Sequence, residues 1–441
     1  MLGVLSSRTA ERATEIGWDV FWLLLAGILV LLIVVLFPYL RHWREILNRR
    51  AVRSLLRGSL LYIFGKRGQR RVQGWRMFFR MRMEMMIHAR MPIRGISRFP
   101  AAKIWVDREA FPRIKKLIRR ARHSVVIQMF IWKDDRLGRE MVELLCDSAD
   151  RGVRVSIRKE AVGDVFELRQ DFLGTRDHAD GVWKRFWHHP RISIVHETCD
   201  DHAKVFIIDD RILLLTGMNI ANEYHDDWHD YLVELRGRAF VEHYLTDGDL
   251  PGAGGTRLSS PGRQAIGGQE ARLVINTGHR KEIRPAVMEL LRGASRSIVL
   301  EHAYLSDDAV LDLLIRRSRE GVRVVVILPL QADVHHFANM QSVGRLLSEG
   351  DGKTMSVFLF PRMLHGKIFL IDRRRAFVGS ANLTTTSLDQ MGEVNVLLEG
   401  RAHAAIRKLR GVLRDDILEG IPVSKPPRFH WLWRWLIWWK L

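Results

Sequence analysis

Apolar and polar positions along this chain follow one α/β pattern twice. Ser124–Ile127 and Ser297–Leu300 are short apolar runs rich in β-branched residues, and such runs are typical of buried strands. An amphipathic helical stretch follows in each half, and then a Gly-Val-Arg-Val run that begins at Gly152 or at Gly321. The copies lie roughly 160 residues apart, a period too long for a solenoid, so the pattern predicts a duplicated α/β domain.

Each half then carries the same polar motif, H-x-K-x4-D. The two copies are His202, Lys204 and Asp209, and His365, Lys367 and Asp372. Each copy continues into a small pair and an asparagine, Thr216-Gly217-Met218-Asn219 and Gly379-Ser380-Ala381-Asn382. Residues two apart in a strand point to the same face, so each His projects together with its Lys. Duplication places both motifs within reach of one site at a pseudo-twofold interface.

Two imidazoles and two ammonium groups suit displacement at phosphorus. A neutral His attacks phosphorus while a second, protonated His gives a proton to the departing alkoxide. Lys204 and Lys367 stabilise the charge on the non-bridging oxygens. The candidates for further hydrogen bonds to the phosphate are Asn219, Asn382, Thr216 and Ser380. The alternative is that each motif is an ordinary strand ending in a polar turn, which two matched copies make improbable.

The carboxylates around the motifs fall into two groups. Asp230 follows His202 by 28 residues, and Glu393 follows His365 by the same interval. A carboxylate on the far imidazole nitrogen fixes the tautomer and favours the imidazolium, so we predict two His–carboxylate pairs. Asp209 and Asp372 stand within the motifs, but for both we favour a structural role over proton transfer.

At this point the residues resemble a known family. The paired motifs are similar to those of the phospholipase D superfamily, and Thr216–Tyr224 with Trp228-His229-Asp230 resembles bacterial cardiolipin synthases. The likeness covers roughly residues 105 to 415. It implies two pseudo-twofold-related lobes of an α-β-α sandwich that share one active site, a covalent phosphohistidine intermediate, transfer of a phosphatidyl group, and no metal or other cofactor. It also places the residues of both motifs at the site, namely His202, Lys204, Asp209 and Asn219 from the first and His365, Lys367, Asp372 and Asn382 from the second.

Two departures from the family pattern stand out. Thr216 occupies a position that is usually Gly, and keeps a hydroxyl there. Glu301-His302-Ala303-Tyr304 replaces a Thr-Pro-Tyr-like run, at a strand end that is expected to border the acceptor pocket.

Composition and the chain ends point to an anionic membrane partner. The formal charge is +20, which favours nucleic acid or an acidic lipid surface. Residues 20–40 form a nearly uncharged apolar run long enough to cross a bilayer, and the arginines that follow predict a cytoplasmic catalytic region. Residues 41–100 mix basic and apolar side chains, as in a helix at an anionic lipid surface or in a linker helix packed on the domain. The tryptophans of 421–441 predict interfacial anchoring, the alternative being packing against the domain.

These segments give a complete division of the chain. We expect an N-terminal flank (1–19), a transmembrane helix (20–40), a basic amphipathic segment (41–100), a first lobe (101–246), a Gly/Pro/Ser-rich linker (247–269), a second lobe (270–420) and a Trp-rich tail (421–441). The chain is therefore predicted to be a single-pass protein of the bacterial cytoplasmic membrane.

The sequence favours a phosphatidyltransferase that makes cardiolipin from two phosphatidylglycerols with release of glycerol. In this hypothesis His202 is the nucleophile and His365 the acid and base. The partners are phosphatidylglycerol, cardiolipin and the membrane, and nucleic acid is not expected. A lipid hydrolase with the same site, a nuclease, and a non-catalytic membrane scaffold remain as alternatives, and the intact motifs and the membrane segments argue against the last two.

Overall fold

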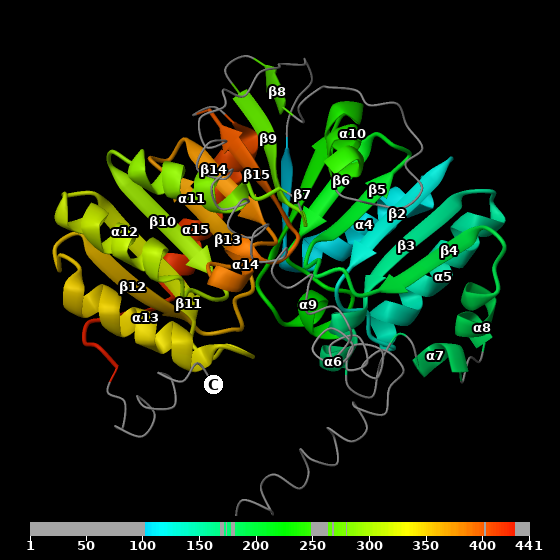
Figure 1. Ribbon diagram of the computed structural model, residues 1–441, viewed down its shortest axis with the longest axis horizontal. Helices are drawn as coiled ribbons and strands as arrows, with labels where there is room; N and C mark the ends of the chain where they lie inside the picture. The colour runs from blue at the N-terminus through cyan, green and yellow to red at the C-terminus, as the bar shows by residue number, and fades with distance from the viewer. Residues whose placement is uncertain are drawn as a thin grey trace, which may run out of the picture. The chain divides into compact units, whose positions relative to one another are not determined.

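Two mixed β-sheets with helices on their faces form the core of the protein (Figure 1). The computed structural model describes residues 102–167, 172, 174–177, 181–247, 263–266, 269–278, 280–400 and 403–427. Within these residues the chain forms two lobes that repeat one topology.

The first lobe is built on a seven-stranded sheet with the order β1-β7-β6-β5-β2-β3-β4. Its strands are β1 (Lys103–Val106), β2 (Ser124–Met129), β3 (Arg154–Glu160), β4 (Ile192–Glu197), β5 (Lys204–Ile208), β6 (Ile212–Thr216) and β7 (Tyr231–Arg236). Its helices are α4 (Ala110–Arg119), α5 (Arg136–Asp150), α6 (Asp164–Glu167), α7 (Gly174–Asp177), α8 (Gly181–Trp187), α9 (Asn222–Asp226) and α10 (Arg238–Asp247).

The second lobe has a nine-stranded sheet with the order β16-β12-β11-β10-β13-β14-β15-β9-β8. Its strands are β8 (Arg263–Ile266), β9 (Gln269–Asn276), β10 (Ser297–His302), β11 (Arg323–Pro329), β12 (Met355–Phe360), β13 (Lys367–Ile371), β14 (Arg375–Gly379), β15 (Glu393–Glu399) and β16 (Ile421–Val423). Its helices are α11 (Ile283–Arg292), α12 (Asp308–Arg319), α13 (His336–Glu349), α14 (Thr385–Asp389) and α15 (Ala404–Glu419).

The two sheets superimpose strand by strand when one order is reversed. The strand β5, which begins at Lys204, pairs antiparallel with β2, and β13, which begins at Lys367, pairs in the same way with β10. Parallel pairing of β2 with β3 and of β10 with β11 continues both sheets outward. The duplicated α/β domain is thereby confirmed, and β8 and β16 are additions to the second sheet.

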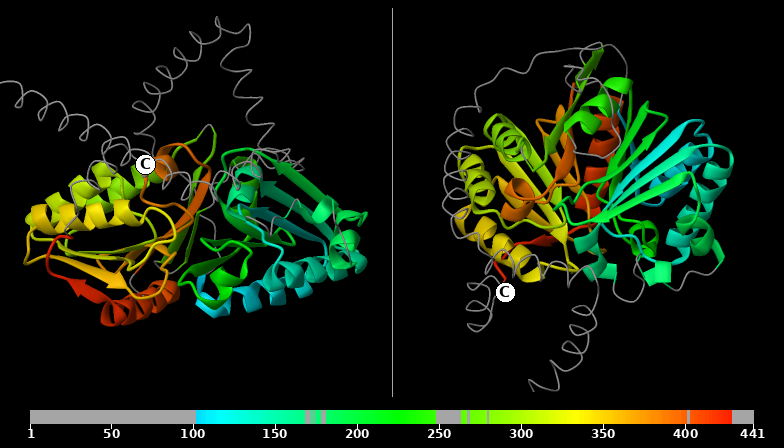
Figure 2. Two further views of the ribbon diagram at one scale, coloured as in Figure 1. Left: turned by 90° about the horizontal axis from the view of Figure 1, so that it is seen from below. Right: turned by 45° about the vertical axis from the view of Figure 1, so that its right-hand side comes forward.

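Both sheets are covered on both faces, which explains the almost continuous apolar sequence of their central strands. In β5, Val205 and Ile207 face a core shared by the two lobes, whereas Phe206 and Ile208 face a core beneath the outer helices. The second lobe repeats this alternation, and α11, α12 and α13 cover its outer core. Figure 2 shows α13 (yellow) and α15 (red) on opposite sides of the second sheet. The two lobes therefore share an inner core, to which the motif-bearing strands β5 and β13 both contribute side chains.

Several predicted segments lie outside the described residues. These are the transmembrane helix 20–40, the basic segment 41–100, most of the linker 247–269, and the tryptophans of the tail. In the described part of the chain no helix combines the length and the apolar character needed to cross a bilayer. Strand β8 falls within the range predicted as linker, and β16 within the range predicted as tail.

Candidate active site

Backbone hydrogen bonds tie each motif to the other lobe. The amide of His202 donates to the carbonyl of Gly392 (2.8 Å), and the amide of His365 donates to the carbonyl of His229 (2.7 Å). Gly392 and His229 are the residues that precede Glu393 and Asp230. Each motif His is thus fixed beside a carboxylate of the opposite lobe, Glu393 at the start of β15 or Asp230 just before β7.

The side chains complete two crosswise His–carboxylate pairs. Nδ1 of His202 lies 3.0 Å from Oε1 of Glu393, and Nδ1 of His365 lies 2.7 Å from Oδ2 of Asp230. The sequence interval identified both carboxylates but not their partners, because each imidazole takes its carboxylate from the other copy. With Nδ1 engaged, Nε2 is the nitrogen left for chemistry at phosphorus.

The two motif lysines are buried beside their histidines. Nζ of Lys204 donates to the carbonyl of His202 (2.6 Å), and Nζ of Lys367 lies 3.2 Å from Nε2 of His365. Burial lowers the pKa of Lys204 to about 7 and that of Lys367 to about 8. A substrate phosphate would favour the charged form of both lysines, since an opposite charge at close range favours the ionised form.

The imidazoles are held in low-polarity surroundings. Burial and the charge of Lys204 lower the pKa of His202, and burial with Lys367 lowers the pKa of His365 well below its ordinary value. The ring of Phe130 packs edge-on against His202 at 4.9 Å. In the free site both imidazoles are therefore neutral, and an anionic substrate is needed for one to keep a proton.

The two carboxylates have different environments. Glu393 accepts hydrogen bonds from the hydroxyls of Ser380 (2.5 Å) and Ser387. Burial opposes its ionisation, but the interaction with His202, the charge of Lys204 and the Ser380 hydroxyl outweigh burial and lower the pKa of Glu393. Asp230 is packed against Gly217, where a Cβ would stand 2.5 Å from Oδ2, and burial raises the pKa of Asp230 to about 7.

Asp209 and Asp372 lie at the other end of their strands from the histidines. Asp209 accepts backbone N–H bonds from Arg122, His123 and Ser124, with the shortest at 2.7 Å. Asp372 does the same for Ser295, Arg296 and Ser297. Each carboxylate closes the turn that leads into the central strand β2 or β10. This geometry supports a structural role and places neither at the reacting atoms.

The four residues predicted to bind phosphate differ in their hydrogen-bond partners. The hydroxyl of Thr216 donates to the carbonyl of Tyr231 (2.7 Å) and that of Ser380 to Glu393, so neither is directed at a phosphate. Oδ1 of Asn219 accepts from the amide of Ile131 (2.9 Å). Oδ1 of Asn382 is buried with no hydrogen-bond partner in the described part of the chain. An amide oxygen only accepts, so Asn382 would meet a phosphate oxygen through its Nδ2 donor.

Aromatic rings line the His365 side, and they fall within the quoted sequence motifs without being among the residues predicted for the site. Tyr224 and Trp228 pack on His365 with ring centroids at 5.2 and 5.3 Å, and Tyr304 lies at 6.3 Å. Tyr304 belongs to the run expected to border the acceptor pocket, and it also contacts the ring of His335. The proximity of Tyr224 and Trp228 to the Asp230 carboxylate was the signal available in the sequence.

Among the described residues, one group of side chains has the composition and spacing of a metal site. It comprises His229, Glu301 and Asp416. The neighbouring pair His335 and His336 is not part of it.

Comparisons with known proteins agree with this geometry. A family model described as "Cardiolipin synthase, PLD-like domain" matches residues 114–247 and 287–414, one match in each lobe. The cardiolipin synthases B of Shigella flexneri and of Escherichia coli (strain K12) are each 27% identical over 345 residues, covering 73% of this chain and 82% of theirs. The major cardiolipin synthase of Bacillus subtilis (strain 168) is 25% identical, covering 70% of this chain and 67% of its own length.

A solved structure shares the fold. The phosphatidylserine synthase of Haemophilus influenzae Rd KW20 aligns with a TM-score of 0.62 at 13% identity, covering 82% of this chain and 97% of that chain. At this identity the likeness concerns the two-lobed architecture alone.

Proposed function

Because this chain belongs to the cardiolipin synthase family of phospholipase D-like proteins, we propose that it is a phosphatidyltransferase that makes cardiolipin from two phosphatidylglycerols. The observation that carries the proposal is the pair of crosswise His–carboxylate contacts, His202 with Glu393 and His365 with Asp230. Two oriented imidazoles are what a two-step displacement at a phosphodiester requires.

The first step forms a phosphatidyl-enzyme. Nε2 of His202 attacks phosphorus, the bond to the glycerol oxygen breaks, and His365 gives its proton to that oxygen. We assign the attack to His202 because its side chain is 14% exposed against 5% for His365, and because Glu393 is anionic behind it. A carboxylate that accepts the Nδ1 proton increases the basicity of Nε2.

The second step transfers the phosphatidyl group. His365 takes the proton from a hydroxyl of a second phosphatidylglycerol, whose oxygen displaces His202 from phosphorus and gives cardiolipin. One phosphodiester is exchanged for another, so no nucleotide is consumed. Lys204, Lys367 and Asn382 are the groups that would bind the non-bridging oxygens.

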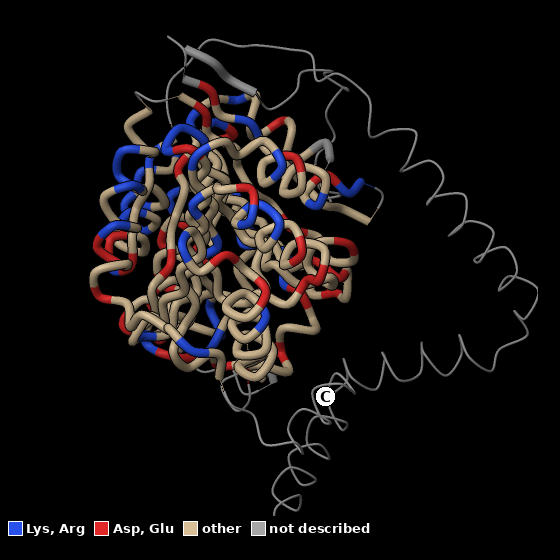
Figure 3. Tube along the Cα trace, turned by 90° about the vertical axis from the view of Figure 1, so that its left-hand side faces the viewer, with Lys and Arg blue, Asp and Glu red and all other residues tan. Residues whose placement is uncertain are grey.

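Membrane attachment is part of the proposal and rests on the sequence. The apolar run 20–40, the basic segment 41–100 and the tryptophans near the C-terminus would hold the site at a lipid surface, with the lobes in the cytoplasm. In Figure 3, basic and acidic positions are interspersed along the described lobes in that view, rather than gathered into a basic face suited to nucleic acid.

The test is product analysis with the purified full chain and labelled phosphatidylglycerol in vesicles. We expect cardiolipin and free glycerol in equal amounts, and no product from the His202→Ala variant. Phosphatidic acid as the sole lipid product would identify a hydrolase instead. Cleavage of DNA without lipid turnover would overturn the lipid assignment.

A further inference from the structure

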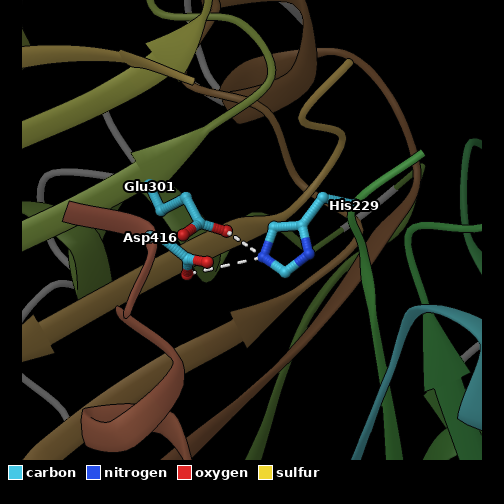
Figure 4. Close-up of side chains that lie close together, drawn as sticks. All are labelled: His229, Glu301 and Asp416. Atoms are coloured by element: carbon cyan, nitrogen blue, oxygen red, sulfur yellow. Dashed lines mark ion pairs between the residues drawn. The ribbon is translucent and has the colours of Figure 1, made fainter. Parts of the chain in front are cut away.

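A buried group of polar side chains from both lobes lies behind the His365–Asp230 pair. His229 and Tyr231 flank Asp230 in the first lobe, and Glu301 on β10 and Asp416 on α15 come from the second. Figure 4 shows both carboxylates directed at Nε2 of His229. None of the four residues is more than 5% exposed, so the group is closed to bulk water.

The donor atoms of this group are spaced like the ligands of a tetrahedral metal ion. Nε2 of His229 lies 3.5 Å from Oε1 of Glu301 and 3.5 Å from Oδ2 of Asp416. The hydroxyl oxygen of Tyr231 lies 3.4 Å from Oδ2 of Asp416 and 2.9 Å from the same Nε2, a hydrogen-bond distance that would have to lengthen for Tyr231 to become a ligand. Nitrogen and oxygen ligands about 2.0–2.2 Å from a zinc ion stand roughly 3.3–3.6 Å apart in a tetrahedron.

The other nitrogen of His229 has the partner expected of a metal ligand. Nδ1 lies 2.7 Å from Oδ1 of Asp107, whose second oxygen is 3.1 Å from Nη2 of Arg362. A carboxylate that accepts the Nδ1 proton fixes the tautomer in which Nε2 offers a lone pair. Asp107 and Arg362 also line a surface cavity of about 900 Å³.

The negative charge and the unsatisfied acceptors of this buried group favour binding of a cation. Both oxygens of Glu301 are buried without a hydrogen bond in the described part of the chain, and its ion pair with Nε2 of His229 is long, at 3.5 Å. A buried carboxylate that is so weakly paired is costly. Three carboxylates surround one imidazole, so even a protonated His229 and Arg362 together leave one negative charge unbalanced. A divalent cation would balance Glu301 and Asp416 and leave His229 neutral.

The pseudo-twofold repeat supplies an internal comparison. Gln128 in β2 holds the position of Glu301, while Gly392 and Val394 hold those of His229 and Tyr231. The first motif has Ala203 between His and Lys, whereas a Cβ on Gly366 would stand 2.6 Å from Glu301 and 2.7 Å from Tyr231. The polar group is therefore a feature of one side only, and Gly366 leaves space for it.

The geometry points to a structural divalent-cation site, best suited to zinc, formed by His229, Glu301, Asp416 and Tyr231. The ion has four protein ligands and no open position, so it joins the lobes and takes no part in the displacement. It holds the strand that carries Asp230 against β10 and α15.

The first test measures metal in the purified full chain after removal of loosely bound ions on a desalting column. We expect about one zinc per chain, and a fall in melting temperature of roughly 5–10 °C after chelation that added Zn²⁺ reverses. Cobalt-loaded protein should give the intense visible absorption of tetrahedral Co²⁺. Absence of that absorption together with a metal content near zero would overturn the proposal and leave a cluster held by protons alone.

Variants separate this site from other metal binding by the chain. Glu301→Gln and Asp416→Asn should each lower the zinc content at least fivefold and abolish the effect of chelator on melting. Glu234→Gln is the matched control, because Glu234 is an equally buried carboxylate that is paired with Arg113, and its zinc content should stay at the wild-type level. Equal zinc in all of these proteins would place the metal elsewhere and overturn the assignment.

Discussion

The two His–carboxylate pairs come from one repeated sequence, yet they are not equivalent. His202 with Glu393 is supported by two serine hydroxyls, whereas His365 with Asp230 is surrounded by Tyr224, Trp228 and Tyr304. The difference follows from two aligned positions. Ser380 donates to Glu393 where Gly217 leaves no room for a side chain beside Asp230, and Ser387 donates to Glu393 where the first lobe has Tyr224. Duplication thus supplied two copies of a pair, and small changes around the carboxylates gave them different properties.

Removal of either imidazole should have the largest effect on activity. His202→Ala and His365→Ala are each expected to lower cardiolipin formation about 10⁴-fold or more, because the two histidines act as a unit. Substantial turnover by one of these variants would contradict the shared site.

A substrate with a good leaving group distinguishes the two histidines. A nitrophenyl phosphodiester needs no general acid, so His365→Ala should release one nitrophenol per chain in a rapid burst, while His202→Ala should release none. The reverse pattern would move the nucleophile to His365.

Replacement of either paired carboxylate should have the next largest effect on activity. Glu393→Gln and Asp230→Asn should each reduce kcat about 10²-fold, because an imidazole without its carboxylate loses its orientation and tautomer. Since they belong to different pairs, the double variant should lose close to the product of the two effects. A double variant no slower than the single ones would show that the pairs do not act separately.

Loss of one hydroxyl tests the asymmetry at the carboxylates directly. Ser380→Ala should lower kcat about tenfold, because a hydrogen bond to a charged group contributes about 1.5–3 kcal/mol and Ser387 remains as a second donor. Ser148→Ala removes an equally buried hydroxyl that donates to the carbonyl of Leu144, and should leave steady-state rates within twofold of wild type. Equal effects of the two variants would rule out a specific role for Ser380.

The pKa values of the two motif lysines predict how activity falls at alkaline pH. A lysine binds phosphate only while it is charged, and the pKa of Lys204, lowered to about 7 by burial, lies below that of Lys367 at about 8. In the free enzyme kcat/KM should therefore begin to fall as the pH rises through about 7, and Lys204→Arg should move this fall upward by about one unit. An unchanged profile in Lys204→Arg would assign the fall to another group.

Asp372 should affect stability with little effect on chemistry. Burial opposes its ionisation, but three backbone amides outweigh burial and lower the pKa of Asp372 to about 2. The stabilisation is therefore present above the ordinary pKa of about 3.8 and is lost as the pH falls towards 2. Asp372→Asn should lower the melting temperature at pH 7 by several degrees, less at pH 3, with kcat within twofold. A tenfold loss of kcat at full stability would return Asp372 to the catalytic set.

The sequence predicted more of the site's membership than of its geometry. The repeat predicted that His202, His365, Asp230 and Glu393 lie in one region, where the structure brings them into two contacts, because motif spacing is preserved when a fold is duplicated. It did not reveal that the pairs cross between lobes, since partners far apart in sequence depend on how the sheets pack. Hydroxyl directions were equally hidden, so Thr216 and Ser380 appeared as phosphate ligands although their hydroxyls bind Tyr231 and Glu393.

The crosswise pairing has a consequence for how such a protein arises. Each lobe holds an imidazole without its own carboxylate, so a lone copy is incomplete and becomes complete only against a second copy. Two identical copies related by a twofold axis would satisfy each other through a self-complementary interface. Joining them in one chain lifts the requirement that the halves be identical. One copy can then have a serine at the position where the other has a glycine.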